Sequence, residues 1–128
     1  MHISIDGVGA NLSIWRFAMK YSLVHVGPNK WFDYKADACF GLIGSLMELG
    51  YDINFKNNEF AIDRMNIVVG IDWLVTNGGT NLLAENNIEY IAMEGELIHN
   101  NTLNNRDKFD FDLYLDYIHN AKSIITPF

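Results

Sequence analysis

The chain has 128 residues and a formal net charge of −7, with 49% hydrophobic and 20% charged residues. This length and composition suit one packed domain and exclude a disordered chain. The nine Lys and Arg residues are scattered singly, which excludes the basic surface that a nucleic-acid partner requires. No apolar stretch approaches the ~20 residues of a membrane span, and the start MHISIDG lacks the layout of a secretory signal, so we expect a cytoplasmic protein.

The first twenty residues allow two interpretations. Residues 2–6 are typical of a strand and residues 11–20 of a helix, which either ends at Lys20 or continues to Val26. We favour the end at Lys20. Between them, Gly7-Val8-Gly9 has the position of a phosphate-binding loop, but the third glycine is missing and an ordinary loop is favoured.

The clearest unit begins at Tyr21. Residues 21–26 form a short apolar run that predicts a buried strand closed by Gly27-Pro28. Apolar residues then recur at helical spacing over residues 36–49, with Asp33 expected as the N-terminal cap and Gly50 as the C-terminal cap.

Three residues inside this helix have an expected packing role. Gly41 and Gly44 weaken a helix intrinsically, so we expect them to permit close packing against a neighbouring element. The lone Cys39 cannot form an internal disulfide and is expected in the core.

The next segments alternate between strands and helices. Residues 51–55, 65–71 and 88–93 predict strands, the last two nearly continuous in apolar character, as in a parallel sheet covered on both faces. Residues 76–87 predict a short capped helix between them. A polar loop is expected over residues 100–108.

The end of the chain repeats the alternation. Residues 111–121 predict a helix, with Asp110 and Asp112 near its N-terminus, and residues 123–126 predict a last strand. Strands alternating with helices indicate a single α/β domain over residues 1–128: a mainly parallel, Rossmann-like sheet in a three-layer α/β/α arrangement. Such folds bind ligands at the carboxyl ends of their strands.

Acidic residues follow two of these strands. Asp72 follows the strand over residues 65–71, and Glu94 and Glu96 follow the strand over residues 88–93. A carboxylate at this edge can act as a general base or bind a sugar hydroxyl, so the three are the candidate catalytic residues, although helix caps or solvated charges are the commoner roles. Gly27-Pro28-Asn29 is the candidate turn for backbone contact with a ligand, although most such turns bind nothing.

Other site classes lack their motifs. The four histidines show no zinc-ligand spacing and Cys39 has no second cysteine, so no metal site is predicted. His25 is expected to be a hydrogen-bonded core histidine. No G-x-S-x-G or Walker motif is present, which excludes common serine hydrolases and P-loop enzymes. No cofactor is predicted, and flavin remains an alternative for this type of sheet.

From Tyr21 onward the order of segments resembles the N-terminal half of a GT-B glycosyltransferase. The resemblance lies in the turn Val26-Gly27-Pro28, the helix end at residues 46–53, Asp72-Trp73, Glu94, and the closing helix and strand over residues 117–128. It implies an acceptor-binding domain for a sugar or glycolipid acceptor, inactive alone. A further C-terminal domain or subunit would then bind the nucleotide-sugar. In the family a His usually ends the later strand, where this sequence has Glu94 and Glu96.

A second hypothesis comes from a different class. Aromatic residues make up 13% of the chain, more than one small core readily hides. This favours a stand-alone α/β binding or interaction module, with a homo-oligomer as its expected state.

Overall fold

A computed structural model describes residues 19–33, 35–94, 98–99, 102–103 and 109–126. The elements expected over residues 2–6 and 11–18, and the Gly7-Val8-Gly9 turn, lie outside these ranges. The first described strand, β1 (Lys20–His25), begins at Lys20. The alternative in which a helix continues to Val26 is therefore wrong.

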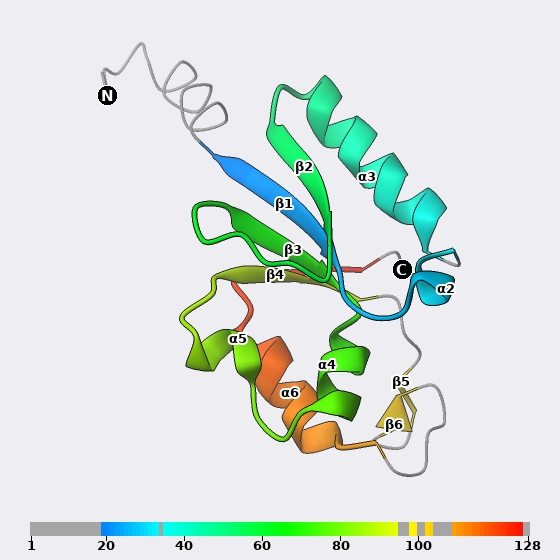
Figure 1. Cartoon of the computed structure of the whole chain (residues 1–128), viewed down its shortest axis with the longest axis vertical. Coiled ribbons are helices and arrows are strands. Elements are labelled where there is room, and N and C mark those ends of the chain that lie inside the picture. Colours follow the sequence, from blue (N-terminus) through cyan, green and yellow to red (C-terminus); the bar gives the residue numbers. More distant parts are fainter. Residues whose placement is uncertain (1–18, 34, 95–97, 100–101, 104–108, 127–128) are drawn as a thin grey trace.

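The centre of the fold is a five-stranded sheet in which every pairing is parallel. Its order is β2-β1-β3-β4-β7, with β2 at Asp52–Asn57, β3 at Met65–Val69, β4 at Tyr90–Met93 and β7 at Ile124–Ile125. Parallel strands need crossover connections, and helices supply most of them here. The predicted Rossmann-like α/β/α architecture is confirmed (Figure 1).

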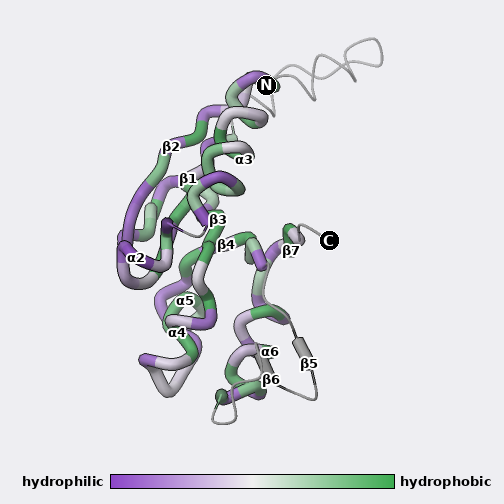
Figure 2. The backbone as a smooth tube through the Cα atoms, turned by 90° about the vertical axis from the view of Figure 1, so that its right-hand side faces the viewer, coloured by the Kyte–Doolittle hydropathy of each residue, from purple (hydrophilic) through white to green (hydrophobic). Residues whose placement is uncertain are grey.

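The helices are divided unequally between the two faces of the sheet. The short α2 (Asn29–Phe32) and the long α3 (Ala36–Glu48) connect β1 to β2. The other face carries α4 (Ile71–Asn77), α5 (Leu82–Glu85) and α6 (Phe111–Asn120). Figures 1 and 2 both show the strands between α3 and the group of α4, α5 and α6.

The core follows from the alternation of side chains along the strands. Val24, Val68 and Ala92 face α4, α5 and α6, whereas Leu23 and Ile67 face α3 together with Cys39. Cys39 is buried, as predicted.

Several local predictions are wrong. β3 ends at Val69 rather than residue 71, because Gly70 turns the chain directly into α4. The segment expected as one helix over residues 76–87 contains the end of α4 and a separate α5, capped by Asn81. Asp33 does not cap α3, whose N-cap position is Lys35.

Two further differences concern loops and packing. A small antiparallel pair, β5 (Ile98–His99) with β6 (Thr102–Leu103), lies partly inside the expected loop over residues 100–108. A Cβ added at Gly41 or Gly44 would meet no atom within 4 Å, so neither glycine permits a close contact within the described part of the chain. Gly50, with φ of +91°, does end α3 in the left-handed conformation, as predicted.

Candidate functional site

At one point in the described sheet, two neighbouring strands are followed by helices that lie on opposite faces. β1 leads into α2 and α3 on one face, and its neighbour β3 leads into α4 on the other. The two loops therefore diverge at the carboxyl ends of β1 and β3. In open α/β sheets, such a switch point is the usual position of a ligand.

Gly70 sets how closely these two loops approach. Its φ is +106°, a left-handed value, and a Cβ at this position would lie 2.1 Å from the carbonyl oxygen of Val26. Any other residue would place its Cβ inside this backbone contact, so only glycine fits at this position. The end of β3 is thus held directly against the segment that leaves β1.

His25 is the last residue of β1 and is fully buried. Its Nδ1 lies 3.1 Å from Asn57 Oδ1, and Asn57 Nδ2 donates to Asn29 Oδ1 at 2.7 Å. Since the amide oxygen of Asn57 can only accept, Nδ1 carries the proton and Nε2 keeps a lone pair. Among the described residues, Nε2 has no hydrogen-bond partner.

The environment of His25 also favours the neutral imidazole. Burial lowers the pKa of His25 below its ordinary value of 6.5; the hydrogen bond that His25 donates to Asn57 and the charge of Asp72 oppose this shift, while Lys35 adds to it. A neutral imidazole with a free lone pair can accept a hydrogen bond from a hydroxyl or take up its proton.

Asp72 lies in the first turn of α4, where a negative charge complements the helix dipole. It is 1% exposed, and its Oδ1 lies 4.0 Å from Lys35 Nζ. Glu94 directly follows β4 and is 7% exposed, with its backbone N–H donating to the Ile125 carbonyl at 2.8 Å. Both predicted acids are therefore buried at the same edge, since Val69 and Met93 are paired neighbours just before them.

The turn after β1 is fixed by hydrogen bonds. Gly27 N–H donates to Asn58 Oδ1 at 2.8 Å, and Asn58 Nδ2 donates to the Gly27 carbonyl at 3.1 Å. Pro28 follows as the N-cap of α2 and has no N–H. The turn therefore offers few backbone donors for a phosphate group.

Two tryptophans flank this turn. The rings of Trp31 and Trp73 meet edge to face, with centroids 5.2 Å apart. A Cβ built on Gly27 would lie 3.5 Å from Trp31 and 3.6 Å from Trp73, so the glycine backbone packs directly against both side chains.

The structure brings five of the six predicted site residues to one edge: Gly27, Pro28, Asn29, Asp72 and Glu94. Glu96 lies outside the described residues. Sequence analysis gave His25 a core role only, and it missed Lys35, Asn57 and the tryptophan pair. The consecutive amides Asn57-Asn58 at the end of a strand were the available signal for one of these.

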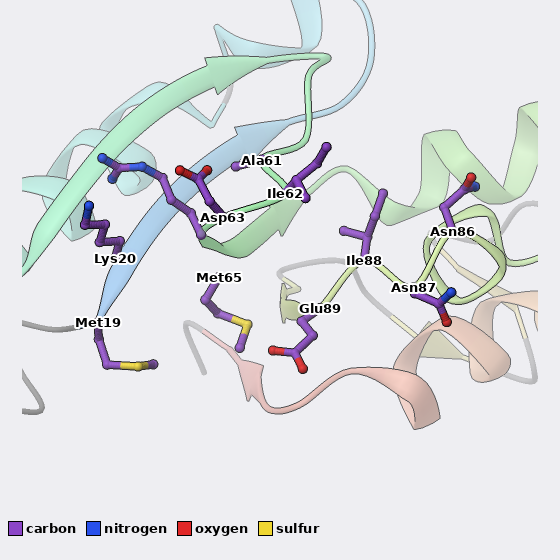
Figure 3. A pocket seen from close by; sticks show the side chains of 11 residues that line it. Met19, Lys20, Ala61, Ile62, Asp63, Met65, Asn86, Asn87, Ile88 and Glu89 are labelled. Carbon is purple, nitrogen blue, oxygen red and sulfur yellow. The ribbon is translucent and has the colours of Figure 1, made fainter.

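A hollow lies at the opposite, amino end of the sheet. It has a volume of about 780 Å³ and is lined by residues that include Lys20, Met65 and Glu89 (Figure 3). Arg64 also lines it, but its Nη1 already donates to the Tyr21 carbonyl and to Asp52 Oδ1. None of the hollow's lining residues is a buried ionisable group, so the carboxyl edge is the stronger candidate site.

Neither a metal centre nor a membrane helix is found in the part of the chain that the structure describes. No three His, Cys, Asp or Glu side chains there are grouped to hold a metal ion. No described helix is both long and apolar enough to cross a bilayer. Comparisons with protein-family models, curated proteins and solved structures found no match.

Proposed function

We propose that this chain is the acceptor-binding domain of a GT-B-like glycosyltransferase, in which the carboxyl edge of the sheet binds a sugar hydroxyl. The observation that carries the proposal is the set of buried groups from three neighbouring strands: His25 at the end of β1, Asp72 after β3 and Glu94 after β4.

The chemistry of these groups selects a type of ligand. The lone pair of His25 and the carboxylates of Asp72 and Glu94 all accept hydrogen bonds. A sugar or other polyol donates several hydrogen bonds and carries no charge. A phosphate group mainly accepts them, and the cation Lys35 already lies 4.0 Å from the carboxylate of Asp72. The edge therefore suits an acceptor sugar better than a nucleotide.

The tryptophan pair supports the same ligand class. Trp31 and Trp73 are each partly buried beside the Gly27 turn, so their rings form the rim of this edge. The apolar C–H face of a sugar packs well on an aromatic ring, while its hydroxyls reach neighbouring carboxylates.

In a transferase, His25 and Asp72 would have distinct roles. The neutral Nε2 would receive the proton of the attacking hydroxyl, while Asp72 would stabilise the resulting imidazolium by its negative charge. The donor would come from a nucleotide-sugar-binding domain or subunit, so the domain alone would bind acceptor without turnover.

A thermal-shift panel tests the proposal. Methyl glycosides and oligosaccharides at millimolar concentration should raise the melting temperature, because a ligand that binds only the folded state stabilises it. UDP and other nucleotides should not. Asp72→Asn should abolish the shift, whereas Asp63→Asn, an exposed acid in the β2–β3 loop, should keep it. Stabilisation by nucleotides alone, or by no sugar at all, would contradict the proposal.

A further inference from the structure

The edge strand β2 has a free outer side. It pairs with β1 on its inner side, and no described residue pairs with its other side. Asn58 N–H donates to the His25 carbonyl at 2.7 Å, so by alternation the backbone groups of Ile53 and Phe55 point away from β1. A six-residue edge with free N–H and C=O groups is a template for another strand.

One flank of α3 is exposed along the same edge. Phe40 and Met47 are 54% and 60% exposed, and Gly44 lies between them on this flank. The Phe40 ring lies 6.0 Å from the ring of Phe55 in β2, which places the flank beside the free strand edge. The space above Gly44 is open.

The sequence of β2 is complementary to itself. In an antiparallel pair centred on Asn54, Asp52 lies opposite Lys56 and Ile53 lies opposite Phe55. The outward-pointing groups of Ile53 and Phe55 then exchange hydrogen bonds, as an antiparallel ladder requires. Moving the register by two residues in either direction loses both charge pairs.

The exposed flank of α3 is also complementary to a second copy of itself. Two antiparallel copies that cross near Gly44 place Phe40 of each copy against Met47 of the other, a favourable sulfur–aromatic pairing. The absence of a side chain at Gly44 lets the two helix axes approach closely.

The two centres of symmetry lie at similar heights along the sheet. Gly44 is six residues before Gly50 in a helix, about 9 Å of rise. Asn54 is four residues after Gly50 and mostly in a strand, about 13 Å of rise. One twofold axis perpendicular to the sheet can therefore pass near both.

We propose that β2 and the Phe40–Gly44–Met47 flank of α3 form the interface of a homodimer, in which the two sheets join through an antiparallel β2–β2 pair. The self-complementary charges favour a second copy over an unrelated strand, because Asp52, which also accepts from Arg64 Nη1 at 2.9 Å, lies opposite the partner's Lys56 in both halves of the pair. These pairs also offset the general repulsion between two chains of net charge −7. The interface is independent of the carboxyl-edge site, so its failure would leave the acceptor proposal standing.

Light scattering coupled to size exclusion tests the dimer on the full 128-residue chain. We expect twice the chain mass of 14.6 kDa. Met47→Glu and Lys56→Asp should each raise the dimer dissociation constant at least about tenfold, because they place a charge in the apolar flank or an acid opposite Asp52. Two controls should keep the dimer: Leu49→Glu, exposed near the end of α3, and Lys122→Asp, exposed beside β7.

An engineered disulfide tests the register. Opposed residues of a pair that exchanges no hydrogen bonds have Cα atoms about 4.5 Å apart, within disulfide range. Asn54→Cys should therefore form a covalent dimer on mild oxidation, whereas Glu59→Cys, exposed beyond the end of β2, should not. A strict monomer, a dimer unaffected by Met47→Glu and Lys56→Asp, or no crosslink at Asn54→Cys would overturn the proposal.

Discussion

The two faces of the sheet differ in how many hydrophobic residues they bury. Among the described residues, the face covered by α4, α5 and α6 contains a cluster of eleven buried hydrophobic residues. The cluster under α3 contains four buried residues, and the other hydrophobic residues packed against them are only partly buried. A helix group spanning three segments of chain seals one face, and a single long helix covers part of the other.

Polar contacts strengthen the α4–α6 face as well. The hydroxyl of Tyr90 donates a hydrogen bond to the Tyr117 carbonyl. The hydroxyl of Tyr117 donates to the Thr80 carbonyl at 3.2 Å and accepts from Leu82 N–H at 3.0 Å. Asn81 caps α5 through bonds from two backbone N–H groups. Each buried polar group in this network has a hydrogen-bond partner, so this face combines an apolar core with polar groups that are all hydrogen-bonded.

The difference indicates where stability and where interaction reside. The α4–α6 face supplies the core, and the α3 face leaves Phe40 and Met47 for contacts outside the monomer. The carboxyl-edge site lies between them, since His25 packs against Phe32 on the α3 side and Asp72 begins α4 on the other.

Paired leucine truncations should show the contrast most strongly. Leu83 is fully buried in the α4–α6 cluster, and Leu42 is partly buried under α3. Leu83→Ala should lower the free energy of unfolding by about 2 to 5 kcal/mol, the usual cost of a core cavity. Leu42→Ala should cost less than about 2 kcal/mol, because its neighbourhood is already solvated. Urea denaturation measures both, and equal costs would remove the distinction between the faces.

Gly70→Ala should affect both faces, because this residue joins the ends of β1 and β3. The added Cβ would overlap the Val26 carbonyl, and the left-handed φ would be strained. We expect a loss of about 3 kcal/mol of unfolding free energy. Gly79→Ala, where a Cβ meets no atom within 4 Å, is the matched control for urea denaturation. A Gly70→Ala protein as stable as that control would contradict the described approach of the two strands.

Protonation of His25 should destabilise the junction between the faces. Its folded pKa is lowered by burial below the ordinary 6.5, so the unfolded chain binds the proton more readily. This contribution to stability is complete above about pH 6.5 and is lost as pH falls through that value towards the folded pKa. Urea midpoints between pH 8 and 5 should decline less steeply in His25→Gln than in the parent, and an equally steep decline in both proteins would contradict this role of His25.

The smallest expected effect is a gain in stability from a substitution in α3. Gly41 lies inside α3 with open space around it, so Gly41→Ala should raise the unfolding free energy by about 0.5 to 1 kcal/mol. Thermal melting would show it as a higher midpoint. A lower midpoint would mean that something packs closely on Gly41 in solution.

Much of the architecture follows from local pattern. The apolar runs at β3 and β4, the periodic apolar residues of α3 and the Asp110 cap of α6, which accepts from Leu113 N–H at 3.0 Å, are all visible in the sequence. They depend on neighbours in the chain, which is why periodicity predicts them.

The unpredicted features depend on contacts across the fold. Gly70 reads as part of an apolar strand, and only the carbonyl of Val26, forty-four residues earlier in the chain, shows why it ends that strand. The His25–Asn57–Asn29 hydrogen bonds likewise join three segments that pattern alone does not bring together. Asp72 and Glu94 were predictable because parallel strands place their ends at one edge.

A two-dimensional ¹H–¹⁵N NMR titration of the full chain with methyl glycosides would locate the sugar site. We expect the chemical-shift changes to concentrate at the carboxyl edge, on the Gly27 and Gly70 amides and on the indole N–H groups of Trp31 and Trp73. Changes confined to the amino-end hollow around Lys20 and Glu89 would contradict this expectation.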